Sequence, residues 1–415
     1  MPSASKSTAY EFDANLEPQE YDDFARQHPY CNLLQSLAWA EVKANWQVVR
    51  VGLRASDGQL CAVAQILIKS LPVGLSFWYI PHGPLLDYNN SDVLNAFLTA
   101  LRELISGTGC VCLRIHPPCP IKVGSIEDFK TGQAKEVINP EYLSNQFKDA
   151  GFIFDKPSLE MGDTIQPRFQ AVILKENWEE PPRGKIRYNL KQNERYHVNF
   201  VSGSEYLDKF DKLVRLTEER QGIALRDKAY FKRILDSYAQ DSFLALADFD
   251  LDKAQENTAK TLEALQEEAR GLEQKAPKKL KQVEEQIVSR EKDWQFYQDL
   301  KEALSDSGHK GSYNPSGILA IRYGKAADMP YAGSDERFSR LPAVWKLYVE
   351  GIRWAFSSGC DRYNLGGLEG SLDDGLTIFK SHFNPQIEET VGEFDYPAKP
   401  LLFKLAKLAW KILRR

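Results

Sequence analysis

The residues best suited to chemistry lie near the C-terminal end of the chain. Residues 364–367 read Asn-Leu-Gly-Gly at the end of a predicted strand, and Phe379-Lys380 follows after a short polar loop. Glycine lets bare backbone approach a ligand closely. Lys380 would place one cation beside the unscreened amides of Gly366 and Gly367, where it could stabilise an oxyanion, with the amide following Phe379 as a supplement. Outside this context, Lys380 would be interpreted as a surface lysine on a loop.

Two other motifs accompany this segment. Residues 81–84 read Pro-His-Gly-Pro, and residues 162–168 read Gly-Asp-Thr-Ile-Gln-Pro-Arg. Together with residues 364–367 and 375–385, they resemble the Fem family of peptidyltransferases (FemABX), most closely its MurM and MurN type, over nearly the whole chain. The resemblance implies an aminoacyltransferase of peptidoglycan synthesis that moves an amino acid, alanine or serine in this type, from aminoacyl-tRNA to the stem-peptide lysine of lipid II.

The implied reaction is the aminolysis of an activated ester, which requires no covalent enzyme intermediate, and we expect no cofactor. The chain accordingly has no G-x-S-x-G nucleophile elbow and no recognisable Cys/His pair. The acceptor amine, with a reference pKa of about 10.4, must still lose a proton. Asp87 and Asp163 lie beside predicted strand ends and could accept it, although each could equally cap a turn. The substrate could also assist itself.

The resemblance further implies a site for the diphosphate of the sugar precursor. Residues 35–43 look like the family segment whose lysine meets the phosphates, which nominates Lys43 together with Trp39. Arg226 and Tyr230 look like the second half of this site. An arginine binds phosphate oxygens in a two-pronged geometry and a lysine acts as a point charge, so the pairing is chemically sensible.

A run of basic residues indicates where tRNA could bind. Three of its members are spaced four residues apart and would form one cationic stripe on a helix. The resemblance places a basic helix here, but a charged helical face often serves solvation only. The residues nominated for tRNA contact are Arg183, Lys185, Arg187, Lys191 and Arg195.

The predicted helices and strands around these residues indicate an α+β (mixed α/β) fold. A chain of 415 residues exceeds what one core usually serves. Apolar runs and helical spacing alternate along it, and the resemblance makes the two units GNAT-like. Strands are expected over residues 61–69, 75–80, 111–115, 169–174, 243–247, 317–323 and 362–365, and helices over 91–105, 206–220 and 342–358.

Residues 251–305 interrupt the second unit. Apolar residues three and four apart form seams on two helices, joined by a short turn at Ala276-Pro277, which predicts an antiparallel coiled-coil arm. Its charges are typical of a solvated helical pair. A cluster at its tip, however, would suit weak contact with a phosphate backbone: Lys275, Lys278, Lys279 and Lys281.

The predicted domains are 1–160 for the first GNAT-like domain, 161–249 with 309–396 for the second, 250–308 for the arm and 397–415 for a C-terminal helix. That helix is basic and amphipathic. It could contact an anionic membrane surface or pack Leu405, Leu408 and Ile412 on the first domain, and Trp410 with the surrounding lysines favours the membrane.

Composition narrows the class of protein. A net charge of −5 does not point to DNA, and the six cysteines lack the spacing of a metal site; Cys110 and Cys112 are expected in a buried strand. The polar N-terminus and the absence of a long apolar run predict a cytoplasmic protein, peripheral at the inner face of the cell membrane. Two other functions remain open: a GNAT acyltransferase using acyl-CoA, whose pyrophosphate loop we do not find, and a non-catalytic coiled-coil adaptor.

Overall fold

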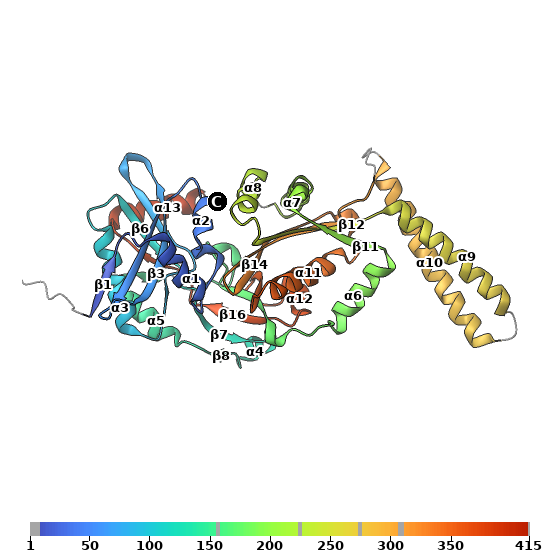
Figure 1. Cartoon of the computed structure of the whole chain (residues 1–415), viewed down its shortest axis with the longest axis horizontal. Helices are drawn as coiled ribbons and strands as arrows, with labels where there is room; N and C mark the ends of the chain where they lie inside the picture. Colours follow the sequence, from blue (N-terminus) through green and yellow to red (C-terminus); the bar gives the residue numbers. More distant parts are fainter. Residues whose placement is uncertain (1–8, 155–157, 223–225, 273–275, 306–310, 414–415) are drawn as a thin grey trace, which may run out of the picture.

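The computed structural model describes residues 9–154, 158–222, 226–272, 276–305 and 311–413, apart from the side chains of 409–413. It shows two mixed α/β units side by side, with a helical arm projecting from the second (Figure 1). The polar N-terminal segment, Lys275 at the arm tip and the Trp410 side chain, which entered the sequence predictions, lie outside the described part.

The first unit is built on an eight-stranded sheet in the described chain. Strand β5 pairs with β3, and the other strands follow the order β1-β2-β3-β4-β6-β17-β9. Its strands are β1 (Tyr10–Asp13), β2 (Gln47–Ala55), β3 (Leu60–Ser70), β4 (Ser76–Ile80), β5 (Leu85–Leu86), β6 (Cys110–Ile115), β9 (Ile153–Phe154) and β17 (Phe394–Tyr396). Its helices are α1 (Pro18–Gln27), α2 (Leu37–Val42), α3 (Ser91–Ile105) and α5 (Pro140–Asp149). Cys110 and Cys112 are buried in β6, as predicted.

The second unit is built on a nine-stranded sheet in the order β11-β12-β13-β14-β15-β10-β16-β7-β8. Its strands are β7 (Pro120–Gly124), β8 (Lys135–Glu136), β10 (Phe169–Leu174), β11 (Val198–Ser202), β12 (Ser242–Phe249), β13 (Ser316–Tyr323), β14 (Ala326–Ser334), β15 (Arg362–Leu368) and β16 (Gln386–Thr390). Its helices are α4 (Ile126–Thr131), α6 (Gly184–Arg195), α7 (Leu207–Gln221), α8 (Lys228–Ser237), α11 (Ala343–Ser357) and α12 (Gly375–Ser381).

The two sheets exchange strands across the predicted domain boundary. Strands β7 and β8, which precede residue 160, join the second sheet through β16. Strand β17, near the other end of the chain, joins the first sheet through β6 and β9. A boundary at residue 160 therefore does not separate the sheets, because the hydrogen-bonded ladders tie each unit to the chain of the other.

A shared hydrophobic core holds the two units together. It combines α2, β3 and β4 of the first unit with α7, α8, β12 and β13 of the second. Trp39 and Val42 on α2 and Tyr230 and Phe231 on α8 are buried in this core. Helices α2 and α8 thus face each other at the junction, which fixes the distance between any ligand groups that they carry.

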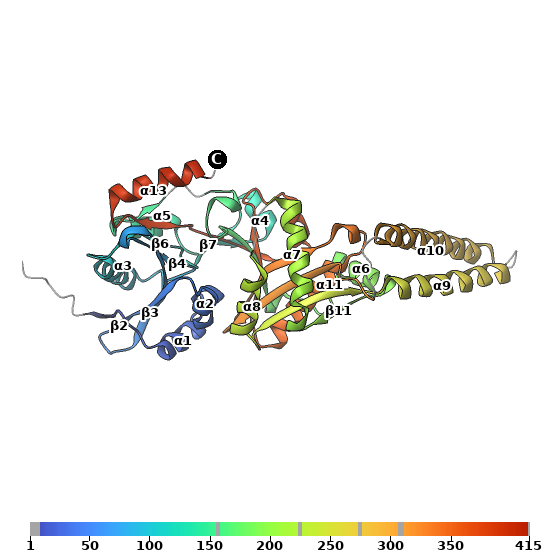
Figure 2. The same ribbon diagram turned by 90° about the horizontal axis from the view of Figure 1, so that it is seen from above.

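The coiled-coil arm consists of α9 (Leu251–Leu272) and α10 (Pro277–Ala303), and it extends away from the body of the protein (Figure 1, Figure 2). Ion pairs join the helices near both ends: Lys279 to Glu268 at 2.8 Å and Lys301 to Asp252 at 3.1 Å. The base of the arm is buried in the core of the second unit.

The last helix, α13 (Pro400–Leu413), lies along the first unit (Figure 2). Among its described side chains, Phe403 is buried against Val111 and Cys112 of β6. None of the described helices is both long enough and apolar enough to cross a membrane.

Candidate functional site

Lys380 lies in α12 and is almost completely buried, with 4% of its surface exposed. Its ammonium donates a hydrogen bond of 2.9 Å to the carbonyl oxygen of Gly367. Burial lowers the pKa of Lys380 to about 8, and the charge of Asp374 partly opposes that shift. The side chain therefore keeps a proton at neutral pH while it is poorly hydrated, which suits a cation that must stabilise developing negative charge.

Gly366 and Gly367 lie where β15 is irregular. Pairing between β10 and β15 shifts register between Gln170 and Val172, so the strand bulges at this point. Gly366 has φ +89°, and a Cβ there would lie 3.6 Å from the Lys380 ammonium. A Cβ on Gly367 would lie 2.5 Å from Pro167. Only glycine fits both positions, because one needs positive φ and the other a close approach.

Asn364 holds the bulge in place, a role that the sequence analysis did not assign to it. Its side-chain oxygen accepts a hydrogen bond of 2.8 Å from the Gly366 amide, and its amide group donates to Gln170 and, at 3.0 Å, to Asp328. The Gly366 amide is therefore occupied, which corrects the expectation of two unscreened amides. The motif Asn-Leu-Gly-Gly signalled Asn364, whereas Asp328, on a strand distant in sequence, carried no signal.

The strands β14 and β15 separate directly beyond this network. Their parallel pairing covers Ala326 with Arg362 through Asp328 with Asn364, although both strands continue further. Burial raises the pKa of Asp328, while the hydrogen bond from Asn364 lowers it. The Lys380 ammonium therefore lies beside a bulge that starts where two parallel strands stop pairing. Such irregular positions leave backbone groups available to a ligand.

Phe379 packs against aromatic side chains of α11 and against Phe383, which follows α12. Its ring centroid lies 5.0 Å from Trp345, 5.0 Å from Tyr348 and 5.5 Å from Phe383. The segment is helical, so the amide following Phe379 lies beyond the first four free N–H groups of α12. It cannot supplement the cation as predicted. Phe379 instead positions the helix that carries Lys380.

Asp87 occupies an exposed turn in the first unit. Its carboxylate accepts a hydrogen bond of 2.9 Å from the Asn89 amide, and its carbonyl accepts one of 3.1 Å from Asn90. Asp163 accepts a hydrogen bond from the Ser158 hydroxyl in another exposed turn. Both carboxylates have the turn-capping role that was the alternative interpretation. Among the described residues, neither makes a recorded contact with Lys380.

The four residues nominated for the diphosphate lie together at the α2–α8 junction. The Lys43 ammonium lies 5.0 Å from the centroid of the Trp39 ring and 5.2 Å from that of Tyr230. The Arg226 guanidinium carbon also lies 5.2 Å from the Tyr230 centroid. Burial, together with the charges of Arg226 and Arg233, lowers the pKa of Lys43 to about 8. A bound anion would relieve that repulsion.

Arg233 is a third cation of this junction, and the sequence analysis missed it. Its guanidinium carbon lies 5.7 Å from the Tyr230 ring centroid. Tyr230 and Arg233 are three residues apart on α8, which was a usable signal because such positions share a helix face, and Arg226 lies just before that helix. We call Lys43, Arg226 and Arg233 the cation cluster. Three like charges at one junction are costly without an anion.

The tRNA stripe is divided by the structure. Four of its cations are exposed on or beside α6: Arg183, Lys185, Arg187 and Lys191. Arg195 differs, because its guanidinium pairs with the buried carboxylate of Asp293 on α10 and also bonds Ser289. Arg195 therefore anchors the arm to the second unit, and its nomination for tRNA contact is corrected.

The Pro-His-Gly-Pro motif lies at the junction of the two sheets. The His82 ring contacts that of His116 at a centroid distance of 5.0 Å, and the Gly83 amide donates to the His116 carbonyl. The His82 carbonyl accepts from Asn32 at 2.8 Å. Burial depresses the pKa of His82, so the ring is neutral. These contacts make the motif a structural connection between β4 and β6.

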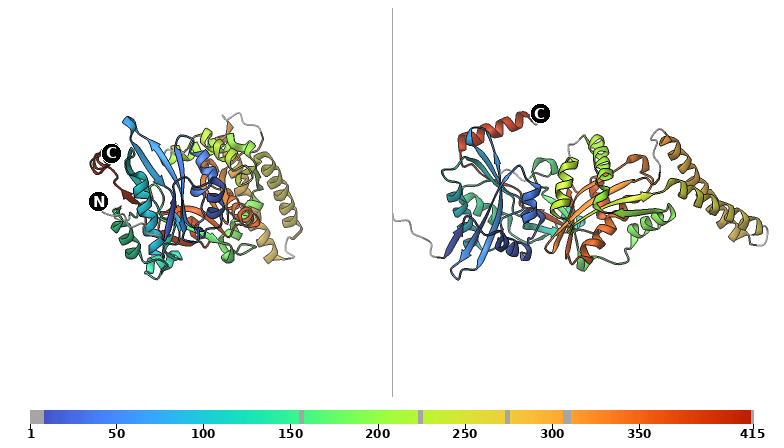
Figure 3. Two further views of the ribbon diagram at one scale, coloured as in Figure 1. Left: turned by 60° about the vertical axis from the view of Figure 1, so that its left-hand side comes forward. Right: turned by 45° about the horizontal axis from the view of Figure 1, so that its top comes forward.

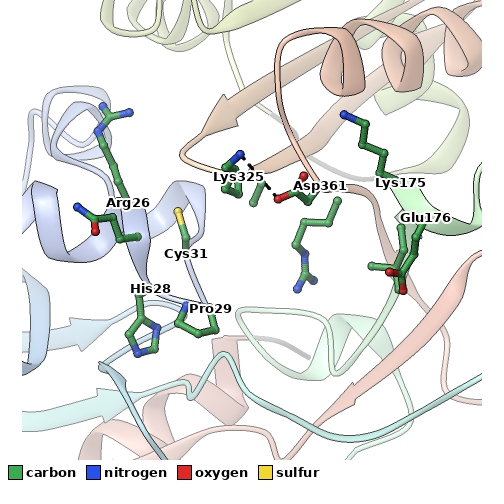
Figure 4. Close-up of a pocket in the computed structure, with 12 residues that line it drawn as sticks. Arg26, His28, Pro29, Cys31, Lys175, Glu176, Lys325 and Asp361 are labelled. Carbon is green, nitrogen blue, oxygen red and sulfur yellow. Dashed lines mark ion pairs between the residues drawn. The ribbon is translucent and has the colours of Figure 1, made fainter.

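A cavity of about 600 Å³ opens between the units, away from the nominated residues (Figure 4). Arg26, His28 and Cys31 line it from the first unit, and Lys175, Lys325 and Asp361 from the second. Its charged groups are partly compensated: Arg26 pairs with Asp22, and Lys325 lies 3.9 Å from Asp361. None of the catalytic or substrate-binding residues nominated from the sequence lines this cavity.

Fold and sites together define a class of protein: two mixed α/β units of the GNAT-like kind, one carrying a lysine beside a strand bulge and both contributing to a cationic junction. The sequence profile of the FemAB family matches residues 16–411. The chain belongs to the FemAB family.

Individual relatives agree with this assignment. The Lipid II:glycine glycyltransferases of Staphylococcus aureus strains bovine RF122 / ET3-1 and USA300 are each 30% identical to the chain over 416 residues, covering 94% of both chains. The crystal structure of FemX superposes with a TM-score of 0.71 at 25% identity, covering 95% of this chain and 99% of that one. These findings confirm the predicted family, fold class and transferase class. The relatives are named for glycine, so transfer of alanine or serine is not confirmed.

Proposed function

We propose that the chain transfers a small amino acid from aminoacyl-tRNA to the stem-peptide lysine of lipid II, and so builds the peptide branch of peptidoglycan. The observation that carries the proposal is the presence of two distinct cationic sites in one FemAB chain. Lys380 is buried beside a strand bulge, whereas the cation cluster lies open at the unit junction. One site suits a reacting carbonyl and the other a diphosphate.

The chemistry requires an amine to attack the ester carbonyl of the aminoacyl-tRNA. A C–N bond forms, the C–O bond to the ribose breaks, and the ribose oxygen leaves with the proton that the amine gives up. Lys380 would stabilise the oxyanion that forms in between, since its ammonium already lies at the Gly366 bulge. We assign no carboxylate as general base, because Asp87 and Asp163 serve turns.

The acceptor would bind at the α2–α8 junction. The cation cluster offers one ammonium and two guanidinium groups to the diphosphate of lipid II. The Lys43 ammonium lies over the Trp39 and Tyr230 rings, contacts that would lower the entropy lost when the phosphates bind. The S. aureus relatives are named for lipid II, which supports this assignment.

The donor would contact the exposed cations of α6. Arg187 and Lys191 lie four residues apart on the helix, and Arg183 precedes it. Alanine at Lys191 should weaken tRNA binding in a salt-dependent way without affecting stability, because the side chain is solvent-exposed. Alanine at Arg195 should instead lower the melting temperature, because it removes one partner of a buried carboxylate.

The amino acid transferred would be small. Sequence resemblance favours alanine or serine, and the names of the relatives favour glycine. We also propose a peripheral position at the cytoplasmic face of the membrane, supported by the amphipathic helix α13 and by a membrane-bound acceptor.

A donor panel tests the proposal. The purified chain is incubated with a lysine-containing, soluble diphosphate precursor and with glycyl-, alanyl- or seryl-tRNA, or with acetyl-CoA. Attachment of one of the three amino acids to the precursor, lost in Lys380→Met, is expected. Consumption of acetyl-CoA with indifference to tRNA would establish the acyl-CoA function in its place, and no consumption of any donor would favour an adaptor.

A further inference from the structure

The helix α13 exposes a row of leucines that the protein does not cover. Leu401 and Leu405 are 78% and 62% exposed, and Leu408 is similarly open. Phe403, on the opposite side, is the described residue of α13 that reaches the core. One side of the helix is thus packed on the protein, while its other, apolar side remains exposed to solvent.

A second apolar projection lies at the turn between β3 and β4. Val73 is 92% exposed and has φ +54°, in a short turn of Pro72–Gly74. A β-branched residue in the left-handed region is strained, and here no burial compensates for that strain. Leu71, on the other side of Pro72, is also exposed. The free protein buries little of Val73, and it leaves 39% of Leu71 in contact with solvent.

The two projections are neighbours in space. Leu75, which ends the turn, and Phe77 on β4 pack on the same small cluster as Phe403 of α13. The amide of Lys399, just before α13, donates to the Val111 carbonyl of β6 at 3.2 Å. Figure 2 and Figure 3 show α13 running beside this end of the first sheet. We call the α13 leucines with Leu71 and Val73 the apolar rim.

Cations accompany the apolar rim. Lys404 is exposed between the leucines of α13 and Lys399 precedes the helix, whereas Lys407 lies 3.9 Å from Asp395 on the docked side. Lys69 stands at the end of β3, its ammonium 5.7 Å from the Trp46 ring. Exposed apolar side chains among lysines match the acyl boundary and the anionic headgroups of a bilayer leaflet.

A chain of aromatic contacts connects the apolar rim to the cation cluster. Phe77, beside the turn, lies 6.3 Å from both Trp46 and Tyr79, measured between ring centroids. The Trp46 amide donates to the Lys43 carbonyl at 2.8 Å. The first unit is therefore continuous from Val73 to Lys43, and the orientation of one fixes the depth of the other.

We propose that α13 and the β3–β4 turn form one docking surface for an anionic lipid leaflet, which sets the cation cluster at the depth of lipid phosphates. The inference rests on the proposed function, because this depth is useful only if the acceptor is a diphosphate-linked lipid, whose phosphates lie there. Contact through two elements fixes the orientation of the protein on the membrane, whereas contact through one helix would only attach it.

Vesicle sedimentation tests the surface with the full chain. Wild type should bind vesicles of phosphatidylglycerol and phosphatidylcholine and not pure phosphatidylcholine vesicles. Val73→Asn should weaken binding about tenfold, because one buried aliphatic side chain is lost. The same variant should raise the melting temperature, since asparagine tolerates the left-handed region. Leu405→Asn should weaken binding similarly.

The matched control is Val288→Asn, an exposed valine on the arm, which should bind as wild type does. The inference would be overturned if Val73→Asn bound vesicles as well as wild type does. It would also be overturned if wild type failed to bind vesicles and the substitutions changed its oligomeric state instead. All variants should retain turnover on the soluble precursor. Failure of wild type on that precursor would overturn the proposed function instead, and vesicle binding separates the two outcomes.

Discussion

Two lysines with the same lowered pKa sit in contrasting surroundings. Burial lowers the pKa of both Lys380 and Lys43 to about 8, but neighbouring charges act oppositely: Asp374 raises the pKa of Lys380, whereas Arg226 and Arg233 lower that of Lys43 further. Lys380 already donates to a backbone carbonyl, while Lys43 faces rings and other cations. One site is prepared for a charge that appears briefly, and the other for an anion that stays.

The largest effect should come from removing the buried cation. Lys380→Met should lower kcat by about 100-fold or more, since one oxyanion donor contributes about 3 kcal/mol. The KM for the acceptor should change little. Steady-state kinetics on the soluble precursor measures both, with Lys260→Met on the arm as the exposed control. Unchanged kcat would remove Lys380 from the mechanism and break the comparison.

A smaller loss is expected at the network behind Lys380. Asn364→Ala frees the Gly366 amide and leaves Asp328 without one hydrogen bond, so the bulge should relax. We expect kcat to fall roughly tenfold with little change in acceptor KM, because a hydrogen bond to a charged group contributes about 1.5–3 kcal/mol. Equal kcat in the variant and wild type, at wild-type stability, would show that the bulge does not depend on Asn364.

Substitutions in the cation cluster should change the acceptor KM and not kcat. Lys43→Met should raise the acceptor KM roughly tenfold and leave kcat nearly unchanged, because it removes binding shared by ground and transition states. An acceptor without the diphosphate should bind the variant and wild type equally. If Lys43→Met lowers kcat as strongly as Lys380→Met, the assignment of separate roles is wrong.

The smallest effect is a pH dependence. At saturating acceptor, kcat should fall roughly threefold between pH 7.5 and 8.5, since a group with a pKa of about 8 loses its proton there. Stability should rise over pH 8 to 10, because the unfolded chain then binds more protons than the folded one. Lys380→Arg should abolish the fall in kcat, as guanidinium does not titrate. A rise in kcat that Lys380→Arg abolishes would make Lys380 a base, whereas a rise common to the variant and wild type would report deprotonation of the acceptor amine.

Local patterns predicted most elements well. Alternating and helical periodicities placed β10 and α3 at their observed bounds, and the seams at Leu262 and Leu265 predicted the arm. Two members of the cation cluster, Lys43 and Arg226, were nominated from the resemblance, whereas Arg233 was missed. The exchange of β7, β8 and β17 was missed, because strand pairing between distant segments leaves no periodic signal.

Residue types in the sequence alone determined the chemistry on offer: a lysine near paired glycines, a lysine and arginine for phosphate, and basic positions along one helix. The tertiary structure decided which of them act together. It buried Lys380 at a bulge, assigned Arg195 to the arm, and packed Leu75 and Phe77 on the cluster that holds Phe403 of α13. The physical reason is that side-chain chemistry is local, whereas burial, pairing and neighbouring charge arise from contacts between segments far apart in the chain.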